Sequence, residues 1–356
     1  MNERQASLEL KIDLLLNGVS LKGEFDLSSR AFLNSISDGI HIILKDDIYI
    51  TATVNKESLF ILEKVSESLI LLHTTKNSHT VKVVPTGKYF EKKSSDGTWL
   101  EDIGTFQTDR LRISAFKGCS FVLKNEGCKF CEASYKRKQR RNKISNIVEL
   151  VSYCERNEER IKHYLVSGGT PPENGWDHFI NVCKAIRNQT NKSIYAMFSP
   201  PPTLDTIDKI VDAGVQDVAI NLELFNREKS IEFIPGKTKL GFNKYSQSLE
   251  YSVKLLGNRG NVKSLLIVGL EDYSDTLNGV EYLAQRGIMP ILSIFKPVMG
   301  TPLEYYPTPN KDDLIDIWMK SQEICEKYSL TLGPLCKCCQ NNTLTIPVND
   351  NYFKYE

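Results

Sequence analysis

Three cysteines lie close together in the segment GCSFVLKNEGCKFC, which runs from residue 118 to residue 131. Thiolate sulfur is a preferred ligand of zinc and of iron–sulfur clusters, so Cys119, Cys128 and Cys131 are candidate metal ligands. Three thiolates can serve either of two kinds of metal site. They can bind a zinc ion whose fourth ligand comes from elsewhere, or three irons of a 4Fe-4S cluster whose fourth iron is free to bind a ligand.

A second group of thiols lies near the C-terminus, at Cys336, Cys338 and Cys339. Three roles are open for it: ligation of an auxiliary iron–sulfur cluster or a metal, a catalytic or substrate-contacting thiol, and free structural cysteines. If a cluster is bound here, Cys336 and Cys339 have the more usual spacing. The remaining cysteines lie alone in helix-like segments and are expected to be small buried apolar residues: Cys154, Cys183 and Cys325.

The composition is that of an ordinary globular protein. The chain has 356 residues, 41% apolar and 25% charged, with a formal net charge of +1, so no global field favours nucleic acid or an anionic membrane. The N-terminal segment is interrupted by Lys11 and Asp13 and does not have the pattern of a signal peptide. No stretch reaches the roughly 20 apolar residues that span a bilayer. We therefore expect a cytoplasmic protein whose nine cysteines form no disulfide framework, which favours metal or redox chemistry for the clustered ones.

Strands and helices alternate from about residue 110 onward, and this order must position the cysteines. Short β-rich runs predict six strands, at 111–115, 163–166, 193–198, 217–222, 262–268 and 290–295. Apolar residues at three- and four-residue steps predict helices between them, at 147–157, 176–187, 204–213, 245–256 and 275–286. Gly214, Gly257 and Gly287 follow three of these helices, as C-terminal caps do. The fold predicted is α/β, a partial (β/α)6 barrel of the TIM type, with its chemistry at the C-terminal ends of the strands.

The first part of the chain has a different pattern. A helix-like start is followed by two strands joined at Asp46-Asp47, and then by a further predicted helix and strand. We therefore expect three units: a small N-terminal α/β appendage (1–105), the barrel (106–332) and a Cys-containing C-terminal extension (333–356).

The cysteine segment directly follows the first predicted barrel strand, and Phe130 stands immediately before its third cysteine. In both respects it resembles the cluster motif of the radical S-adenosylmethionine (SAM) superfamily, in which this aromatic residue can pack against the adenine of SAM. The spacing here is C-x8-C-x2-C, whereas the usual family motif is C-x3-C-x2-C. Extra residues in a loop cost little, because closure entropy grows slowly with length.

Later segments resemble the same family, in order, at the ends of successive strands. Ser167-Gly168-Gly169-Thr170 is similar to the glycine-rich turn whose carbonyls receive the SAM amino group, with Thr170 where the family commonly has Glu. The fourth strand ends in Asn221-Leu222-Glu223, which resembles the Asn-Leu-Asp segment of biotin synthase that contacts the SAM ribose.

Two more segments extend this resemblance. The fifth strand runs into Gly269-Leu270-Glu271, similar to the segment that lines the adenine. The sixth runs into KPVMGTP (296–302), as in the biotin synthase-like branch. Candidate holders of the SAM carboxylate are Ser199, after the third strand, and a lysine after the fourth, either Lys237 or Lys244.

The resemblance implies a radical SAM enzyme, oxygen-sensitive, with a 4Fe-4S cluster on Cys119, Cys128 and Cys131. Such an enzyme reductively cleaves SAM to a 5′-deoxyadenosyl radical, which abstracts hydrogen from a small organic substrate in a rearrangement, cleavage, cyclisation or sulfur insertion. The basic run at 135–143 is either a solvated helix face or a docking patch for a flavodoxin or ferredoxin electron donor. Neither a membrane nor a nucleic acid is expected as a partner. The alternative from another class is a non-catalytic, zinc-stapled binding protein.

Overall fold

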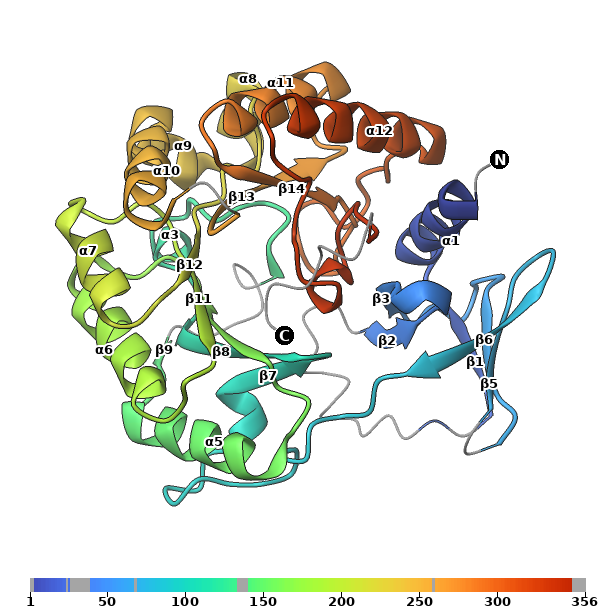
Figure 1. Cartoon of the computed structure of the whole chain (residues 1–356), viewed down its shortest axis with the longest axis horizontal. Helices are drawn as coiled ribbons and strands as arrows, with labels where there is room; N and C mark the ends of the chain where they lie inside the picture. Colours follow the sequence, from blue (N-terminus) through green and yellow to red (C-terminus); the bar gives the residue numbers. More distant parts are fainter. Residues whose placement is uncertain are drawn as a thin grey trace.

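The barrel sheet forms as the sequence predicts. The computed structural model describes residues 3–23, 25, 39–66, 69–132, 140–257 and 260–347. Within them, six parallel strands lie side by side in chain order: β8 (Arg110–Lys117), β10 (His163–Gly168), β11 (Ser193–Met197), β12 (Asp217–Ala219), β13 (Val262–Val268) and β14 (Met289–Ile294). The sheet curls into a half-barrel with helices on its outer face (Figure 1), which confirms the predicted fold class.

The outer layer consists of amphipathic helices whose apolar stripes face the sheet: α5 (Ile144–Asn157), α6 (Trp176–Arg187), α7 (Asp205–Asp212), α10 (Phe242–Leu256), α11 (Tyr273–Ala284) and α12 (Lys311–Lys327). In α5, Ile147, Leu150, Val151 and Cys154 recur at three- and four-residue steps and are fully buried. Each large apolar side chain buried in this way contributes roughly 1.5–3 kcal/mol. The structure adds two short helices to the fourth unit, α8 (Arg227–Phe233) and α9 (Pro235–Leu240), which the sequence analysis did not predict.

Two further strands pair with β8. β7 (Gly104–Gln107) runs antiparallel to β8 and straddles the boundary expected at residue 105, and β9 (Arg140–Arg141) pairs with the other end of β8. The barrel sheet therefore begins slightly before the expected domain boundary.

The N-terminal unit contains α1 (Glu3–Asn17) and a sheet in the order β1 (Ser20–Lys22), β4 (Ile61–Lys64), β5 (Ile70–His73), β6 (Ser78–Val83), β2 (Gly39–Ile43) and β3 (Tyr49–Thr53). The prediction of a helix after β3 is wrong, because the described residues there form β4, β5 and β6. Ile61 and Leu62, then Ile70, Leu71 and Leu72, are apolar runs too short for a helix, and they pair as antiparallel strands.

After α12 the chain returns to the barrel and lies along β14. Gly333 bridges Ile291, and the Leu344 amide donates to the Leu292 carbonyl at 2.8 Å. The N-terminal unit covers this segment from the other side: the Thr51 amide donates to Asn341 at 2.7 Å, and the buried Lys11 amine donates to Gln340 at 2.6 Å. The C-terminal segment is thus held between the two sheets (Figure 1).

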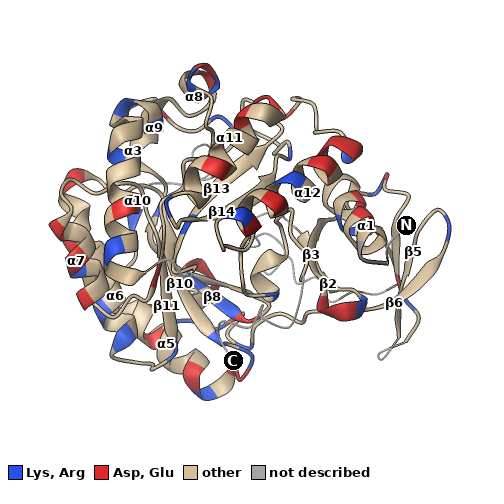
Figure 2. Ribbon diagram, turned by 45° about the horizontal axis from the view of Figure 1, so that its top comes forward, with Lys and Arg blue, Asp and Glu red and all other residues tan. Residues whose placement is uncertain are grey.

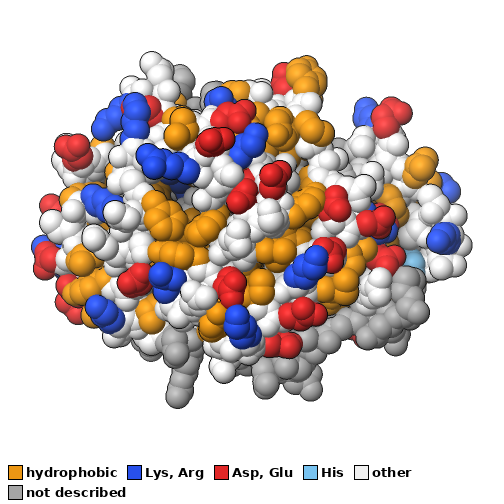
Figure 3. Space-filling model, turned by 90° about the horizontal axis from the view of Figure 1, so that it is seen from above, with side chains coloured by type: hydrophobic (Ala, Val, Ile, Leu, Met, Phe, Trp, Pro, Cys, Tyr) orange, Lys and Arg blue, Asp and Glu red, His pale blue; other side chains and the backbone are white. Residues whose placement is uncertain are grey.

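The charged side chains are distributed without a dominant sign. Acidic and basic residues are interspersed over the outer helices (Figure 2), and on the face seen from above apolar side chains are interrupted by charges of both signs (Figure 3). Within the part of the chain that the structure describes, no helix is both long and apolar enough to cross a bilayer.

Candidate active site

The cysteine loop and the glycine-rich turn are in direct contact at the C-terminal end of the sheet. The Ser120 amide, next to Cys119, donates to the Thr170 carbonyl at 3.0 Å. A Cβ on Gly169 would lie 1.9 Å from the Gly118 oxygen and 2.4 Å from Cys119 Cα. Only glycine fits here, so the turn after β10 fixes the backbone that carries the first cysteine.

The three loop thiols lie within electrostatic range of one another. Burial is the main factor that raises the pKa of Cys128, and the thiols of Cys131 and Cys119 raise it further, whereas Lys237 lowers it. Cys128 is 8% exposed, while Cys119 and Cys131 are partly exposed. A buried thiol of raised pKa becomes a ligand when a metal displaces its proton, so Cys128 suits a metal site and not a free nucleophile.

The residues that lengthen the loop are packed against α9. They form the short helix α3 (Ser120–Leu123), in which Phe121 is buried. A Cβ on Gly236 would lie 2.5 Å from the Phe121 ring, and the Gly236 amide donates to the Glu126 carbonyl at 3.0 Å. The unusual spacing therefore ties the cysteine loop to the segment that carries Lys237.

Lys237 is the lysine that the fold brings to the fourth strand. Its amine donates to the Glu223 carboxylate at 2.6 Å and to the Asn221 carbonyl at 2.9 Å. Burial alone would lower the pKa of Lys237, but the Glu223 charge outweighs it and raises the pKa. Glu223 has a positive φ of 69°, an uncommon conformation for a non-glycine residue, which turns the strand end toward Lys237. Lys244, by contrast, is a half-buried residue in the first turn of α10.

Two other predicted residues meet at the ends of β10 and β11. The hydroxyls of Thr170 and Ser199 are 2.8 Å apart. Ser199 lies near enough to the buried Tyr245 hydroxyl to lower its pKa against the larger effect of burial, and the Lys237 amine lies 5.9 Å from the Tyr245 ring centroid. The sequence analysis did not select Tyr245, because an aromatic residue inside an amphipathic helix has no distinguishing local pattern.

Phe130 and Leu270 share one apolar cluster with the cysteines. Cys128 and Leu270 are buried in it, and Phe130 and Cys131 pack against it. Next to Leu270, the Glu271 carboxylate accepts the Phe225 amide at 2.8 Å. Burial raises the pKa of Glu271 to about 7. This hydrogen bond links the loop after β13 to the loop after β12.

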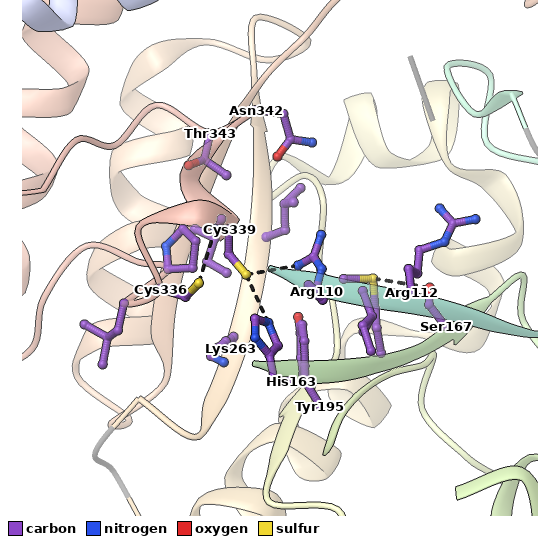
Figure 4. Close-up of a pocket in the computed structure, with 16 residues that line it drawn as sticks. Arg110, Arg112, His163, Ser167, Tyr195, Lys263, Cys336, Cys339, Asn342 and Thr343 are labelled. Atoms are coloured by element: carbon purple, nitrogen blue, oxygen red, sulfur yellow. Dashed lines mark hydrogen bonds between the residues drawn. The ribbon is translucent and has the colours of Figure 1, made fainter. Parts of the chain in front are cut away.

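The second cysteine group lies at the opposite end of the barrel. Cys336 and Cys339 face Arg110 and His163, the first residues of β8 and β10 (Figure 4). A hydrogen bond with Cys336 lowers the pKa of Cys339 well below its usual value against the effect of burial, and Arg110 and His163 act in the same direction. Cys338 interacts with both Cys336 and Tyr49 and raises the pKa of each.

A cavity of about 230 Å³ fills the barrel between the two ends. Its floor contains Cys336 and Cys339, and Ser167 and Met197 line it from the C-terminal half of β10 and β11. The cationic side chains in its wall are Arg110, Arg112 and Lys263 (Figure 4).

Within the described residues, one set of candidate ligand atoms is compact enough for a single ion, and it is not the cysteine loop. The atoms of Asp109, His163, Cys336 and Cys339 all lie within 4.8 Å of one another. Tetrahedral zinc places its sulfur ligands about 3.8 Å apart, as bonds of about 2.3 Å require, whereas in a 4Fe-4S cluster each cysteine binds a different iron. The wider grouping of the loop cysteines therefore fits a cluster better than one zinc ion.

Asp109 and His163 were missed by the sequence analysis. Each stands alone at the start of a strand, more than a hundred residues from Cys336 in the sequence. No local spacing links them, and only the position of the C-terminal segment brings them together. Most of the basic run, residues 135–139, lies outside the described residues, while Arg140 and Arg141 are exposed.

The sequence of this chain is similar to a known protein family and to several individual proteins. A family model described as the Radical SAM superfamily matches residues 117–295, half of the chain. The bacteriochlorophyllide c C-7(1)-hydroxylase of Chlorobaculum limnaeum is 28% identical over 38% of this chain and 34% of its own length. The probable dual-specificity RNA methyltransferase RlmN of Exiguobacterium sibiricum is 25% identical over 42% of this chain and 44% of its own length. The chain thus spans less than half the length of these two relatives.

Two solved structures share low sequence identity with this chain. A radical SAM methyltransferase from Sphaerobacter thermophilus has a TM-score of 0.47 and 16% identity, with 74% of this chain and 71% of that chain covered. Methylornithine synthase (PylB) has a TM-score of 0.48 and 15% identity, with 61% and 62% covered. The range matched by the family model contains the cysteine loop and every candidate SAM-binding residue named above.

Proposed function

Because this chain belongs to the radical SAM superfamily and is an enzyme that uses a 4Fe-4S cluster and SAM, we propose that it abstracts hydrogen from a small organic anion held in the barrel cavity. Family membership removes the alternative of a non-catalytic, zinc-stapled binding protein. The reaction that follows abstraction depends on the substrate.

The cysteine loop fits the cluster in both chemistry and position. Cys119, Cys128 and Cys131 would bind it, at the end of the barrel where loops carry the chemistry. When bound, the cluster supplies the electron that cleaves SAM to methionine and a 5′-deoxyadenosyl radical. Gly169 holds the Cys119 backbone in place, and the apolar cluster around Cys128 shields its thiol from water.

The remaining residues suit the different parts of SAM. Lys237 offers a buried cation for the carboxylate, and Glu223 offers a carboxylate that accepts hydrogen bonds from both ribose hydroxyls. The carbonyls of Ser167, Gly168 and Gly169 are candidates for the amino group. Ser199 and Thr170 add hydroxyls, and Asn221 an amide, at the same edge. Phe130 and Leu270 present an apolar surface suited to adenine.

The substrate is inferred from the cavity. Its volume of about 230 Å³ lies just below the range of about 300–1,000 Å³ for drug-sized ligands, which suits a small substrate. The cavity wall contains the cationic side chains Arg110, Arg112 and Lys263, of which Arg110 lies 3.4 Å from Cys339 Sγ and Lys263 lies 3.8 Å from Asp217. A small molecule with a carboxylate or phosphate would be held by these cations. Such a cavity favours this class over RNA, the substrate that the name of the RlmN relatives gives for those proteins.

The electron donor is proposed from charge. Arg140 and Arg141 are exposed at β9, beside the cysteine loop, and belong to the basic run at 135–143. An acidic flavodoxin or ferredoxin would be steered to such a patch. The division into an appendage (1–105), barrel (106–332) and extension (333–356) is retained as a proposal, with β7 assigned to the barrel sheet.

The convergence of the cysteine loop, Gly169 and Lys237 at one edge of the sheet carries the proposal. The test is anaerobic reconstitution with iron and sulfide, followed by dithionite and SAM. We expect a 4Fe-4S signal in electron paramagnetic resonance that shifts with SAM, and formation of 5′-deoxyadenosine.

Cys128→Ala is expected to abolish both results, whereas Cys154→Ala, the matched control in the buried face of α5, should retain them. Intact SAM in the wild-type reaction would contradict the proposal. Turnover stimulated by RNA, but by no small anion, would contradict the substrate class.

A further inference from the structure

Four candidate metal ligands lie together at the base of the barrel, at the end opposite the cysteine loop. We infer that Asp109, His163, Cys336 and Cys339 bind one zinc ion, which fastens the C-terminal segment to the barrel. The four residues come from the start of β8, the start of β10 and the segment after α12, so an ion here joins parts of the chain that are far apart in sequence.

The ligand atoms lie at about the spacing of a coordination tetrahedron. Cys336 Sγ lies 3.3 Å from Asp109 Oδ2, and Cys339 Sγ lies 3.2 Å from His163 Nε2. The other ring nitrogen of His163, Nδ1, lies 3.8 Å from Asp109 Oδ2, and one of the two nitrogens would serve as the ligand. Bonds of about 2.0–2.3 Å in tetrahedral zinc give ligand separations of about 3.3–3.8 Å. All four ligand atoms lie within 4.8 Å of one another, so little movement is needed to surround one ion.

Burial and charge support a divalent cation. His163 is fully buried, and Cys336 and Cys339 are 7% and 9% exposed. Two thiolates, a carboxylate and a neutral imidazole carry three negative charges, and a divalent ion leaves one. The Arg110 guanidinium, 3.4 Å from Cys339 Sγ, neutralises the remaining charge. A buried group of this kind is stable only when its charges are balanced.

The mixed donor set selects zinc over an auxiliary iron–sulfur cluster. Two sulfurs, one nitrogen and one oxygen in a tetrahedral arrangement match the borderline-soft zinc ion. A cluster would need cysteines placed on separate irons, whereas Cys336 and Cys339 lie in one compact group with a carboxylate and an imidazole.

The site closes the cavity floor. Cys336 and Cys339 line that floor together with Pro334 and Leu335, and the same segment contacts the N-terminal unit through the Thr51–Asn341 hydrogen bond. With four protein ligands the ion would have no open position, which is typical of structural zinc. Its role is to hold the C-terminal segment in place.

The experiment measures zinc in the full chain after purification in air, where the loop cluster is lost. We expect about one zinc per chain in the wild type and almost none in a Cys336→Ser/Cys339→Ser variant. Cys338→Ser is the matched control from the same turn and should keep its zinc. A triple variant, Cys119→Ala/Cys128→Ala/Cys131→Ala, should also keep it, which separates this site from the proposed SAM chemistry.

A second measurement does not depend on the double variant folding. In the triple-variant background, zinc is removed with a chelator and replaced by Co²⁺. We expect intense tetrahedral d–d bands and thiolate charge-transfer bands that saturate at about one equivalent and change in His163→Ala. Octahedral spectra, wild-type protein without zinc, or zinc retained in the double variant would each overturn the inference. So would an iron–sulfur signal in the reconstituted triple variant.

Discussion

Replacing Gly169 with alanine tests the central contact of the candidate active site. The added Cβ would lie 1.9 Å from the Gly118 oxygen and 2.5 Å from Cys119 Cβ, whereas ordinary contacts begin at 3.4 Å. The two backbones must therefore separate by about 1.5 Å, and overpacking of this kind costs about 1–3 kcal/mol. Misplacing a catalytic group by about 1 Å lowers a rate about 100-fold. We expect Gly169→Ala to lose cluster iron and at least that much SAM cleavage.

The assay combines iron and sulfide content after anaerobic reconstitution, the rate of 5′-deoxyadenosine formation and urea unfolding. Gly257→Ala is the matched control, because its Cβ meets open space and only its positive φ of 78° causes strain. That strain costs about 1–2 kcal/mol, so stability falls by a similar amount far from the cysteine loop. Normal cleavage in Gly169→Ala would refute the reasoning. Equal losses of activity in both variants would refute it too, because global stability would then be the cause.

Three other substitutions have defined outcomes. Lys237→Met removes a charge-assisted hydrogen bond worth about 1.5–3 kcal/mol, so calorimetry should show SAM binding weakened about 10- to 100-fold. Lys244→Met should change SAM binding little. Equal losses of affinity in the two variants would contradict the assignment of Lys237. Burial lowers the pKa of Lys11 to about 7 from 10.5. Above pH 7 the unfolded chain therefore holds a proton that the folded chain lacks, and the free energy of unfolding should rise with pH up to about 10. In Lys11→Met this contribution should vanish, and an identical pH dependence of urea unfolding in both proteins would count against it. Burial lowers the pKa of Lys296 to about 8, and among the described residues its amine has no hydrogen-bond partner. Lys296→Met should stabilise the fold by roughly 1–3 kcal/mol in thermal unfolding, and a lower midpoint would show that the amine has a stabilising contact.

The barrel was predictable because its elements are strongly periodic. The predicted strand at 262–268 and helix at 176–187 coincide with β13 and α6. Gly214, Gly257 and Gly287 adopt the positive φ that a helix C-cap requires. The strand expected at 217–222 has regular pairing only to Ala219, since the chain turns toward Glu223 beyond it.

Other features depend on tertiary contacts that no local sequence pattern reveals. The sequence left Lys237 and Lys244 equivalent, and the packing of α9 on the cysteine loop brings Lys237 to Glu223. His163 and Asp109 are isolated in the sequence, so only the returning C-terminal segment makes them a group with Cys336. The strands of the N-terminal unit were obscured because short apolar runs fit a helix and a strand equally well.

The pairing of residues 333–344 with β14 has a consequence for biogenesis. These residues are synthesised after every strand of the barrel, so the nascent sheet carries an open edge at β14 until they emerge. Open edges recruit strands from other molecules, and a chain interrupted before residue 333 would expose that edge permanently. Premature termination in this region should therefore yield aggregated protein instead of a shortened, folded barrel.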